Sequence, residues 1–278
     1  KHKDNWDKYF TELKNELTIE YKKIKEDIEI LEDSNNIQKI EIESSDYSKR
    51  ISDMSVPTFV KICTASTSYM KNESFSDEKN LNLYEYLNEY GKRDKAILYS
   101  AFETFLEKLD GQKINVIDWG SQQGIATILL QDFIREKQLK IETKEIVLIL
   151  PSIKSLNRAM LYCNILNNNK EKIFGINKKL ENLLEKEFNL DEDAITINIF
   201  YNIENLDKNI YEKIRKYQNT INDNYFIVLS SQSEHDSNNI FMYYKNYDAK
   251  LISERIGRIG KYNRNELIFE FTHDEIPF

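Results

Sequence analysis

Apolar positions along the chain change their spacing in a regular way from about residue 81 onward. Short apolar runs, typical of buried strands, alternate with segments in which apolar residues recur every three or four positions, as on one face of a helix. The predicted strands span residues 114–119, 145–150, 172–176, 194–200, 225–230, 249–256 and 265–272. The predicted helices span residues 81–90, 97–109, 124–138, 152–167, 179–188 and 208–221.

The order of these elements predicts the fold class. Four alternations of strand and helix imply a parallel sheet with right-handed crossovers. The last two strands are separated by a short turn near Asn263 and Asn265, and such a pair can add an antiparallel edge. We therefore expect an α/β, Rossmann-like domain over residues 81–278, with a seven-stranded, mostly parallel sheet and flanking helices.

The first 80 residues follow a different pattern and are expected to form a mainly helical N-terminal extension. Apolar and aromatic residues recur at helical spacing over 5–32, which predicts one long amphipathic helix. This helix either docks on its own domain or binds a protein partner. Residues 37–80 are expected to form a small irregular module, in which Ile40 and Ile42 alternate with glutamates as on a half-buried strand.

Composition narrows the range of partners and compartments. The net charge of −8 argues against a nucleic acid partner, because phosphate backbones attract clustered Lys and Arg. Two cysteines without a pairing framework indicate a reducing compartment, so a cytoplasmic location is expected. No run of about 18 apolar residues is present, so no membrane span is expected. The sequence begins at Lys1, which is consistent with a piece of a longer polypeptide.

The richest chemical signal lies at residues 114–127. An apolar strand ends in Asp118, a tight turn contains Gly120 and Gly124, and an amphipathic helix begins at once. Nucleotide-type cofactors bind at such a first strand-to-helix turn, where helix N–H groups face the ligand. Gln122 stands where a further glycine is usual in such loops. Its side chain must point away from the turn if a cofactor is to lie against the backbone.

Other strand ends supply further candidates. Leu150 ends the second strand, where an acid usually accepts hydrogen bonds from the ribose hydroxyls. Asn177 follows the third strand, at the same predicted edge of the sheet. The predicted substrate mouth contains Phe200, Tyr201, Asn202 and His235. A core position is the alternative for Phe200, a helix cap for each asparagine, and a solvated loop for His235.

Several other chemistries do not fit the sequence. Ser121 lies one place too early for a nucleophile elbow. No phosphate-binding loop of the Gly-x-x-x-x-Gly-Lys-Ser/Thr type occurs. The three histidines, His2, His235 and His273, have no metal-ligand spacing among themselves or with the cysteines, so no metal site is expected.

Residues 86 to about 256 resemble an uncharacterised bacterial family with a class I S-adenosylmethionine-dependent methyltransferase-like domain. The resemblance is carried by four segments: Tyr-Gly-Lys-Arg-Asp-Lys-Ala at 90–96, Asp-Trp-Gly-Ser-Gln-Gln-Gly-Ile-Ala-Thr at 118–127, Leu-Ile-Leu-Pro-Ser at 148–152 with Ser-Leu-Asn-Arg-Ala at 155–159, and Asn-Ile-Phe-Tyr-Asn-Ile at 198–203. Five parallel strands with a closing pair are also the arrangement of this class of enzymes.

The resemblance implies an S-adenosylmethionine site with altered contacts. The implied cofactor-binding residues are Asp118, Gly120, Ser121, Gln122, Gly124, Leu150 and Asn177. In the methyltransferase-like family that the chain resembles, the position of Asn177 is the usual place of an adenine contact. The chain departs from the family pattern with Ser121 for Cys, Gln122 for Gly, Leu150 for Glu and Asn198 for His. Three interpretations stay open: a methyltransferase, a non-catalytic binding or assembly module of a larger bacterial protein, and a pocket for another small ligand. Whether the chain is an enzyme is left undecided by the sequence.

Overall fold

The structure is a computed structural model that describes residues 39–42, 59, 78–120, 122–166, 172–184, 187–188, 190–203, 206, 208–217, 223–230 and 235–272. The predicted helix over 5–32, and with it the predicted partner-binding surface, lies outside these residues. The division of the chain at residue 80 stays a prediction.

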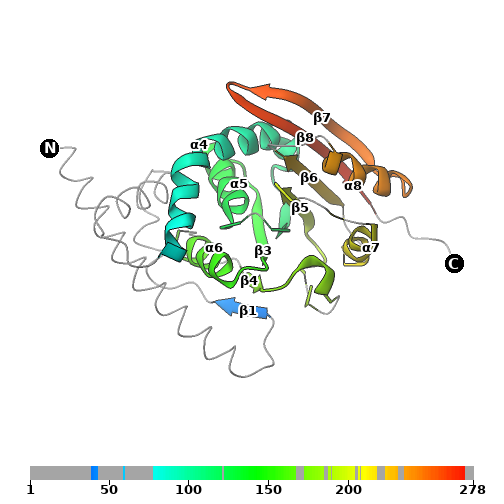
Figure 1. Ribbon diagram of the computed structural model, residues 1–278. Helices are drawn as coiled ribbons and strands as arrows, with labels where there is room; N and C mark the ends of the chain where they lie inside the picture. Colours follow the sequence, from blue (N-terminus) through cyan, green and yellow to red (C-terminus); the bar gives the residue numbers. More distant parts are fainter. Residues whose placement is uncertain are drawn as a thin grey trace.

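An eight-stranded mixed sheet forms the centre of the domain, in the order β1-β4-β3-β2-β5-β6-β8-β7 (Figure 1). The strands are β1 (Lys39–Ile42), β2 (Lys113–Asp118), β3 (Glu142–Ile149), β4 (Lys172–Ile176), β5 (Ile195–Tyr201), β6 (Asn224–Ser230), β7 (Lys250–Ile259) and β8 (Tyr262–Phe271).

The sheet confirms the predicted fold class. Strands β4, β3, β2, β5 and β6 pair in parallel, and β8 pairs antiparallel with both β6 and β7. This is the Rossmann-like order, which reverses direction between β2 and β5, followed by the closing antiparallel pair of a class I methyltransferase-like fold. All seven predicted strands are present. The eighth, β1, pairs antiparallel with β4, so residues 39–42 form the strand that the alternation at Ile40 and Ile42 indicated.

Helices cover both faces of the sheet. The helices are α4 (Glu78–Phe105), α5 (Ile125–Glu136), α6 (Ile153–Leu166), α7 (Lys208–Lys216) and α8 (His235–Lys245), with 3-10 turns at Leu106–Leu109 and Leu180–Asn182. Figure 1 shows α4, α5 and α6 on one side of the sheet and α7 and α8 on the other. Each side has its own hydrophobic cluster, which explains why the strands are apolar at nearly every position.

Four predictions about the elements are wrong. The segments 81–90 and 97–109 are not separate helices but one, because the single Gly91 is tolerated inside α4, which buries it. Residues 179–188 were predicted to form a helix, but the described residues form a 3-10 turn at 180–182 and a further 3-10 residue at Glu187, with no α-helix. There, the backbone is extended at Lys179 and Leu183, and the Leu184 N–H donates to the Glu187 carboxylate instead of to a helical carbonyl.

The other two corrections concern the C-terminal region. The segment that begins at His235 forms helix α8 and not a loop. The turn of the last hairpin lies at Gly260 and Lys261, so both strands are longer than predicted and Asn263 and Asn265 belong to β8. The positive φ of Gly260 (58°) allows this short turn. No helix of the described residues is long and apolar enough to cross a membrane.

Candidate functional site at the carboxyl edge of the sheet

The predicted site residues converge because they follow neighbouring parallel strands. Asp118 ends β2, Leu150 follows β3, Asn177 follows β4 and Asn202 follows β5. The carboxyl ends of these strands lie at one edge of the sheet, next to the point where the strand order reverses. Ligands of open α/β sheets bind at this place.

The turn between β2 and α5 depends on backbone conformations that favour glycine. Gly120 has φ of 124°, and Gly124, the N-cap of α5, has φ of 70°. A Cβ on residue 124 would lie 3.0 Å from the Cβ of Ala159, so α5 and α6 approach each other too closely for a side chain here. A Cβ on residue 120 would lie 3.4 Å from Cδ1 of Ile203. The positive φ therefore favours glycine at both positions, and the close contact with Ala159 adds to this at residue 124.

Gln122 fits this turn in an unusual conformation. Its φ is 38°, in the left-handed region that glycine adopts more easily, and its N–H donates to the Gly120 carbonyl at 2.7 Å. Its side chain is exposed. The turn therefore accommodates a glutamine without burying it. Ser121 lies outside the described residues.

Asp118 is buried and fixes the turn to the helix. Its side chain is 2% exposed, and Oδ2 accepts a 2.9 Å hydrogen bond from the Thr127 hydroxyl in the first turn of α5. A carboxylate at this position also faces the positive end of the helix dipole. Since the first N–H groups of a helix have no acceptor within the helix, the turn brings polar backbone groups to the sheet edge.

The residue that follows β3, Leu150, differs from the turn residues, because its side chain is apolar and points away from the sheet edge into the core. Leu150 is 5% exposed and belongs to the hydrophobic cluster on the α4–α6 face. Its backbone is held firmly, since its N–H donates to the Ile176 carbonyl at 3.0 Å and its carbonyl accepts from the Asn177 side-chain amide at 2.9 Å. Asn177 thus bridges the ends of β3 and β4, and it is half-buried.

The structure describes the side chains of three of the four substrate-mouth candidates, Phe200, Tyr201 and Asn202, and their environments differ. Phe200 lies in the core, as its alternative interpretation expected: it is 1% exposed and stacks between Trp119 and Phe226 at centroid distances of 5.5 and 6.1 Å. Asn202 is half-buried, has φ of 52° and donates its N–H to the Leu229 carbonyl at 2.8 Å. His235 is placed by its backbone at the start of α8.

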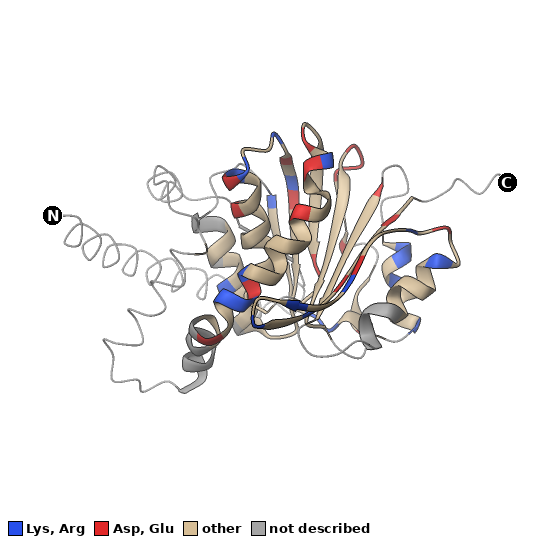
Figure 2. Ribbon diagram, turned by 90° about the horizontal axis from the view of Figure 1, so that it is seen from above, with Lys and Arg blue, Asp and Glu red and all other residues tan. Residues whose placement is uncertain are grey.

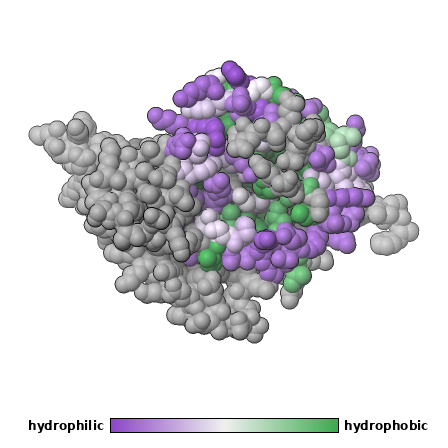
Figure 3. Space-filling model, viewed as in Figure 1, coloured by the Kyte–Doolittle hydropathy of each residue, from purple (hydrophilic) through white to green (hydrophobic). Residues whose placement is uncertain are grey.

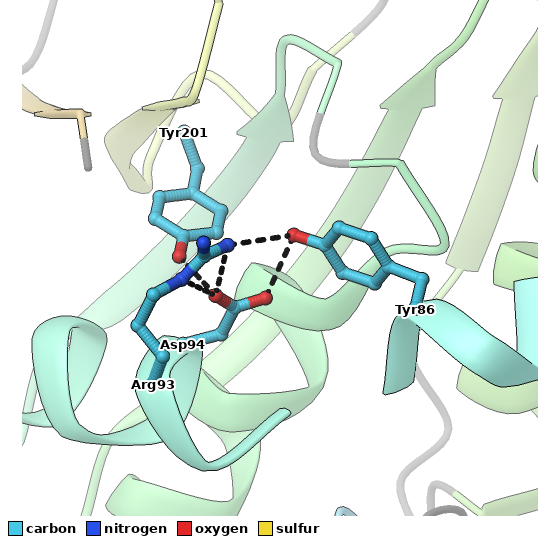
Figure 4. A network of polar contacts seen from close by, with 4 residues as sticks. All are labelled: Tyr86, Arg93, Asp94 and Tyr201. Carbon is cyan, nitrogen blue, oxygen red and sulfur yellow. Dashed lines mark hydrogen bonds and ion pairs between the residues drawn. The ribbon is translucent and has the colours of Figure 1, made fainter. Parts of the chain in front are cut away.

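Tyr201 belongs to a buried polar network that sequence reasoning missed (Figure 4). Asp94 of α4 has no exposed surface, and its Oδ1 accepts hydrogen bonds from the Tyr201 hydroxyl at 2.5 Å and from Arg93 Nε at 3.0 Å. Its Oδ2 accepts from the Tyr86 hydroxyl at 2.9 Å. The network joins α4 to the carboxyl end of β5, so it holds this helix beside the candidate site.

Burial dominates the electrostatics of this network. Desolvation raises the pKa of Asp94 above its ordinary value, although the hydrogen bond from Tyr201 and the Arg93 guanidinium favour the charged form. Burial, together with the nearby Asp94 charge, raises the pKa of both Tyr86 and Tyr201. Both tyrosines therefore stay neutral hydrogen-bond donors at neutral pH.

The sequence contains one feature that indicates such a network, an acidic residue on the apolar stripe of α4. The buried stripe of α4 includes Leu87, Gly91, Asp94, Leu98, Ala101 and Phe105. An acid on an otherwise apolar stripe must find partners inside the protein. The partner in β5, Tyr201, lies 107 residues away and could not be inferred from spacing.

A second missed contact lies on the opposite face. The Trp119 indole N–H donates to Oδ1 of Asn198 at 3.0 Å, and both side chains are fully buried. Asn198, which replaces the histidine of the resembled family, therefore has an internal partner. No group of three or more His, Cys, Asp or Glu side chains with metal-binding geometry occurs in the described part of the chain.

Comparisons with known proteins find solved structures of low sequence identity and low TM-score. No family model matches it, and no curated protein sequence does. A proposed class I S-adenosylmethionine-dependent methyltransferase of Listeria monocytogenes has a TM-score of 0.47 at 10% identity, covering 79% of this chain and 69% of that chain. M. capricolum TrmK, in complex with S-adenosylhomocysteine, has a TM-score of 0.42 at 14% identity, covering 63% and 71%.

An rRNA methylase from Streptococcus thermophilus has a TM-score of 0.39 at 15% identity, covering 65% of this chain and 96% of that chain. At these values the fold assignment rests on the strand order and not on the neighbours. The chain thus has a class I methyltransferase-like domain by its topology.

Proposed function

We propose that the domain binds S-adenosylmethionine or S-adenosylhomocysteine at the carboxyl edge of its sheet. The observation that carries this proposal is the turn from Asp118 to Gly124. It keeps both glycine conformations and the buried carboxylate. Of the two glutamines before Gly124, Gln122 is exposed and Gln123 is buried. A backbone cradle of this kind costs conformational strain, and such strain is typical of ligand sites.

The residues of the site fit such a ligand in part. Gly120 and the first turn of α5 would lie against the methionine portion, and Asn177 would lie near the adenine. Leu150 offers no acceptor to the ribose hydroxyls, and an unsatisfied polar group of this kind costs about 1–3 kcal/mol. The affinity is therefore expected to be about 10- to 100-fold weaker than with an acid at this position.

When bound, S-adenosylmethionine would supply an activated methyl group. What the chain itself would contribute is alignment, since methyl transfer depends mainly on the geometry of the reacting groups. Asn202 and the rigid end of β5, held to α4 through Tyr201 and Asp94, border the place where an acceptor would lie. A methyltransferase is the enzymatic interpretation of this arrangement.

The alternative is a domain that has kept the fold and serves as a binding or assembly module. Two features favour it: the Leu150 side chain lies in the hydrophobic core, and the Ile203 side chain lies close to Gly120. Calorimetric titration of the chain with S-adenosylmethionine and S-adenosylhomocysteine separates the two proposals. Micromolar to submillimolar binding supports a cofactor site. No binding at millimolar ligand contradicts it and leaves the assembly module or a pocket for another small ligand.

Replacing Leu150 tests the ribose contact directly. The Leu150 side chain packs in the hydrophobic core, so the carboxylate of Leu150→Glu has to turn out toward the sheet edge to avoid burial without a partner. In the folded variant that carboxylate supplies the missing acceptor, and we expect affinity to rise about tenfold. Leu150→Gln is the matched control, because it has the same length and a weaker acceptor, and a smaller gain is expected. Equal affinity for all three folded chains would show that the side chain at position 150 does not contact the ligand.

A further inference from the structure

The last hairpin extends past the sheet as a two-stranded arm, which we define as residues 255–265. The final pair between β6 and β8 is Ser230 with Asn265. Pairing between β7 and β8 continues from there to Ile259 and Tyr262. Beyond the pair of Ile256 with Asn265, no described strand lies beside the arm, and Figure 1 shows both strands running past the end of β6.

The charge of the arm is opposite to that of the chain. Its 11 residues contain Arg255, Arg258, Lys261 and Arg264 and no Asp or Glu. The formal charge is +4, or +2 with the flanking Glu254 and Glu266, in a chain of net charge −8. Figure 2 shows Lys and Arg along this hairpin. At physiological ionic strength charges are screened beyond about 8 Å, so a ligand at the arm experiences the local charge more than the net charge.

Two of the four cations fix the arm. Nη1 of Arg264 donates to the Ser100 hydroxyl of α4 at 2.6 Å and lies 3.5 Å from the buried carboxylate of Glu266. Nε of Arg255 lies 3.6 Å from the same carboxylate. These contacts anchor the base of the arm to α4. Ile259 and Tyr262, next to the turn, pack against the hydrophobic cluster on the same face, so the tip has a defined direction.

The other two cations face solvent. Arg258 and Lys261 are exposed, and neither forms an ion pair with another described residue. Asn263, the cross-strand partner of Arg258, is exposed as well. The tip therefore presents hydrogen-bond donors without a carboxylate. A phosphodiester backbone suits such a surface, because its anionic oxygens are acceptors only.

The arm also lies beside the candidate site. The base of the arm pairs with Ser230, at the carboxyl end of β6. The residue before it, Leu229, accepts a hydrogen bond from the N–H of Asn202, a candidate site residue at the end of β5. A polymer bound along the arm would therefore pass the carboxyl edge of the sheet. A two-stranded ribbon also has the width to enter a nucleic acid groove.

We propose that the arm binds the phosphate backbone of a nucleic acid. Binding itself does not depend on the proposed cofactor site, and only a role for the nucleic acid as methyl acceptor rests on that proposed function. The net charge of the chain argues against such a partner, and the proposal rests instead on the local charge of the arm.

Fluorescence anisotropy tests the proposal with labelled 20-nucleotide single-stranded RNA, single-stranded DNA and duplex DNA at 50–200 mM salt. The double variant Arg258→Ala with Lys261→Ala removes both exposed cations. Its control, Lys208→Ala with Lys216→Ala on α7, removes the same charge from exposed positions on the other side of the sheet. We expect at least a tenfold loss of affinity for the arm variant and less than a twofold loss for the control.

The salt dependence gives a second readout. Losing two phosphate contacts is expected to reduce the slope of log affinity against log salt by about 1.4–1.8. Equal losses for both variants, or no binding at 50 mM salt, would overturn the proposal. Displacement of the RNA by polyglutamate at matched charge would overturn it in favour of an acidic protein partner. Titration of the arm variant with S-adenosylhomocysteine separates the nucleic acid proposal from the cofactor proposal. We expect the affinity of the arm variant for S-adenosylhomocysteine to equal that of the unsubstituted chain.

Discussion

The two faces of the sheet differ in what they bury. The face beneath α7 and α8 carries a line of stacked aromatic rings that crosses four strands: Trp119, Phe200, Phe226 and Phe269. The face beneath α4, α5 and α6 buries charged groups near the carboxyl edge, including Asp94 and Asp118. Buried charges cost stability and aromatic stacking adds to it. The difference indicates that one face mainly supports the fold and the other shapes the candidate site.

The outer surface is mainly hydrophilic. In the view of Figure 3, hydrophobic residues appear in the middle of the face and hydrophilic residues surround them. Most of the buried apolar surface is inside the two clusters on either side of the sheet. If the division is correct, substitutions on the two faces should separate stability from ligand binding.

The largest effect is expected from the aromatic face. Phe226→Ala removes a ring that stacks on Phe200 and Phe269 and also contacts Tyr244, so we expect the free energy of unfolding to fall by about 3–5 kcal/mol. Denaturant unfolding measures this loss. We expect the folded variant to bind S-adenosylhomocysteine as tightly as the unsubstituted chain does. A large change in this affinity would contradict the division between a supporting face and a face that shapes the site.

A loss of about 3 kcal/mol is expected from the polar face with Asp94→Ala. This change leaves Arg93 and the hydroxyls of Tyr86 and Tyr201 without their shared acceptor. The estimate is at the lower end for a broken buried pair, because the Arg93 side chain is 17% exposed and can be rehydrated. Urea unfolding measures the loss, and a change below about 1 kcal/mol would mean that the network does not hold α4 to β5.

The pH dependence of the same site has a defined sign. Burial raises the pKa of Asp94 above its ordinary value of 3.8, so the folded chain holds this proton at pH values where the unfolded chain has lost it. Ionisation of Asp94 therefore lowers stability as pH rises from about 4 through the folded pKa. Asp94→Asn lacks this proton, so its deficit in unfolding free energy should be greatest near pH 4 and smaller at pH 7. A deficit that grows toward pH 7 would contradict the account.

The smallest change in stability is expected in the turn between β2 and α5, where the substitution should also weaken ligand binding. Gly124→Ala places a Cβ at positive φ and 3.0 Å from the Cβ of Ala159, so we expect a loss of about 1–3 kcal/mol. Gly111→Ala is the control, since it has a similar φ of 83° and open space around its Cβ position. Only the change at residue 124 should weaken binding of S-adenosylhomocysteine.

Much of this fold could be predicted from the sequence, because strand and helix periodicities are strong where both faces of a sheet are covered. All seven strands and the turn with Gly120 and Gly124 follow from local patterns. The helix predicted over 179–188 failed because a side-chain acceptor, Glu187, replaces a helical carbonyl there. Helix α8 was missed because no clear apolar period precedes Ile240.

The candidate site could be predicted only as far as it is local. The strand ends identify Asp118, Leu150 and Asn177, since topology brings them to one edge. The link between Asp94 and Tyr201, and the anchoring of Arg264 to Ser100, join residues that are 107 and 164 positions apart. Such contacts depend on how α4 packs across the sheet, which local sequence patterns do not encode.

A crystal structure of the chain grown with millimolar S-adenosylhomocysteine tests the central claim most directly. The account predicts ligand density against Gly120 and the first turn of α5, with the adenine toward Asn177 and no side-chain contact to the ribose from Leu150. An empty turn with Ile203 packed over Gly120, or density bound elsewhere, would contradict it.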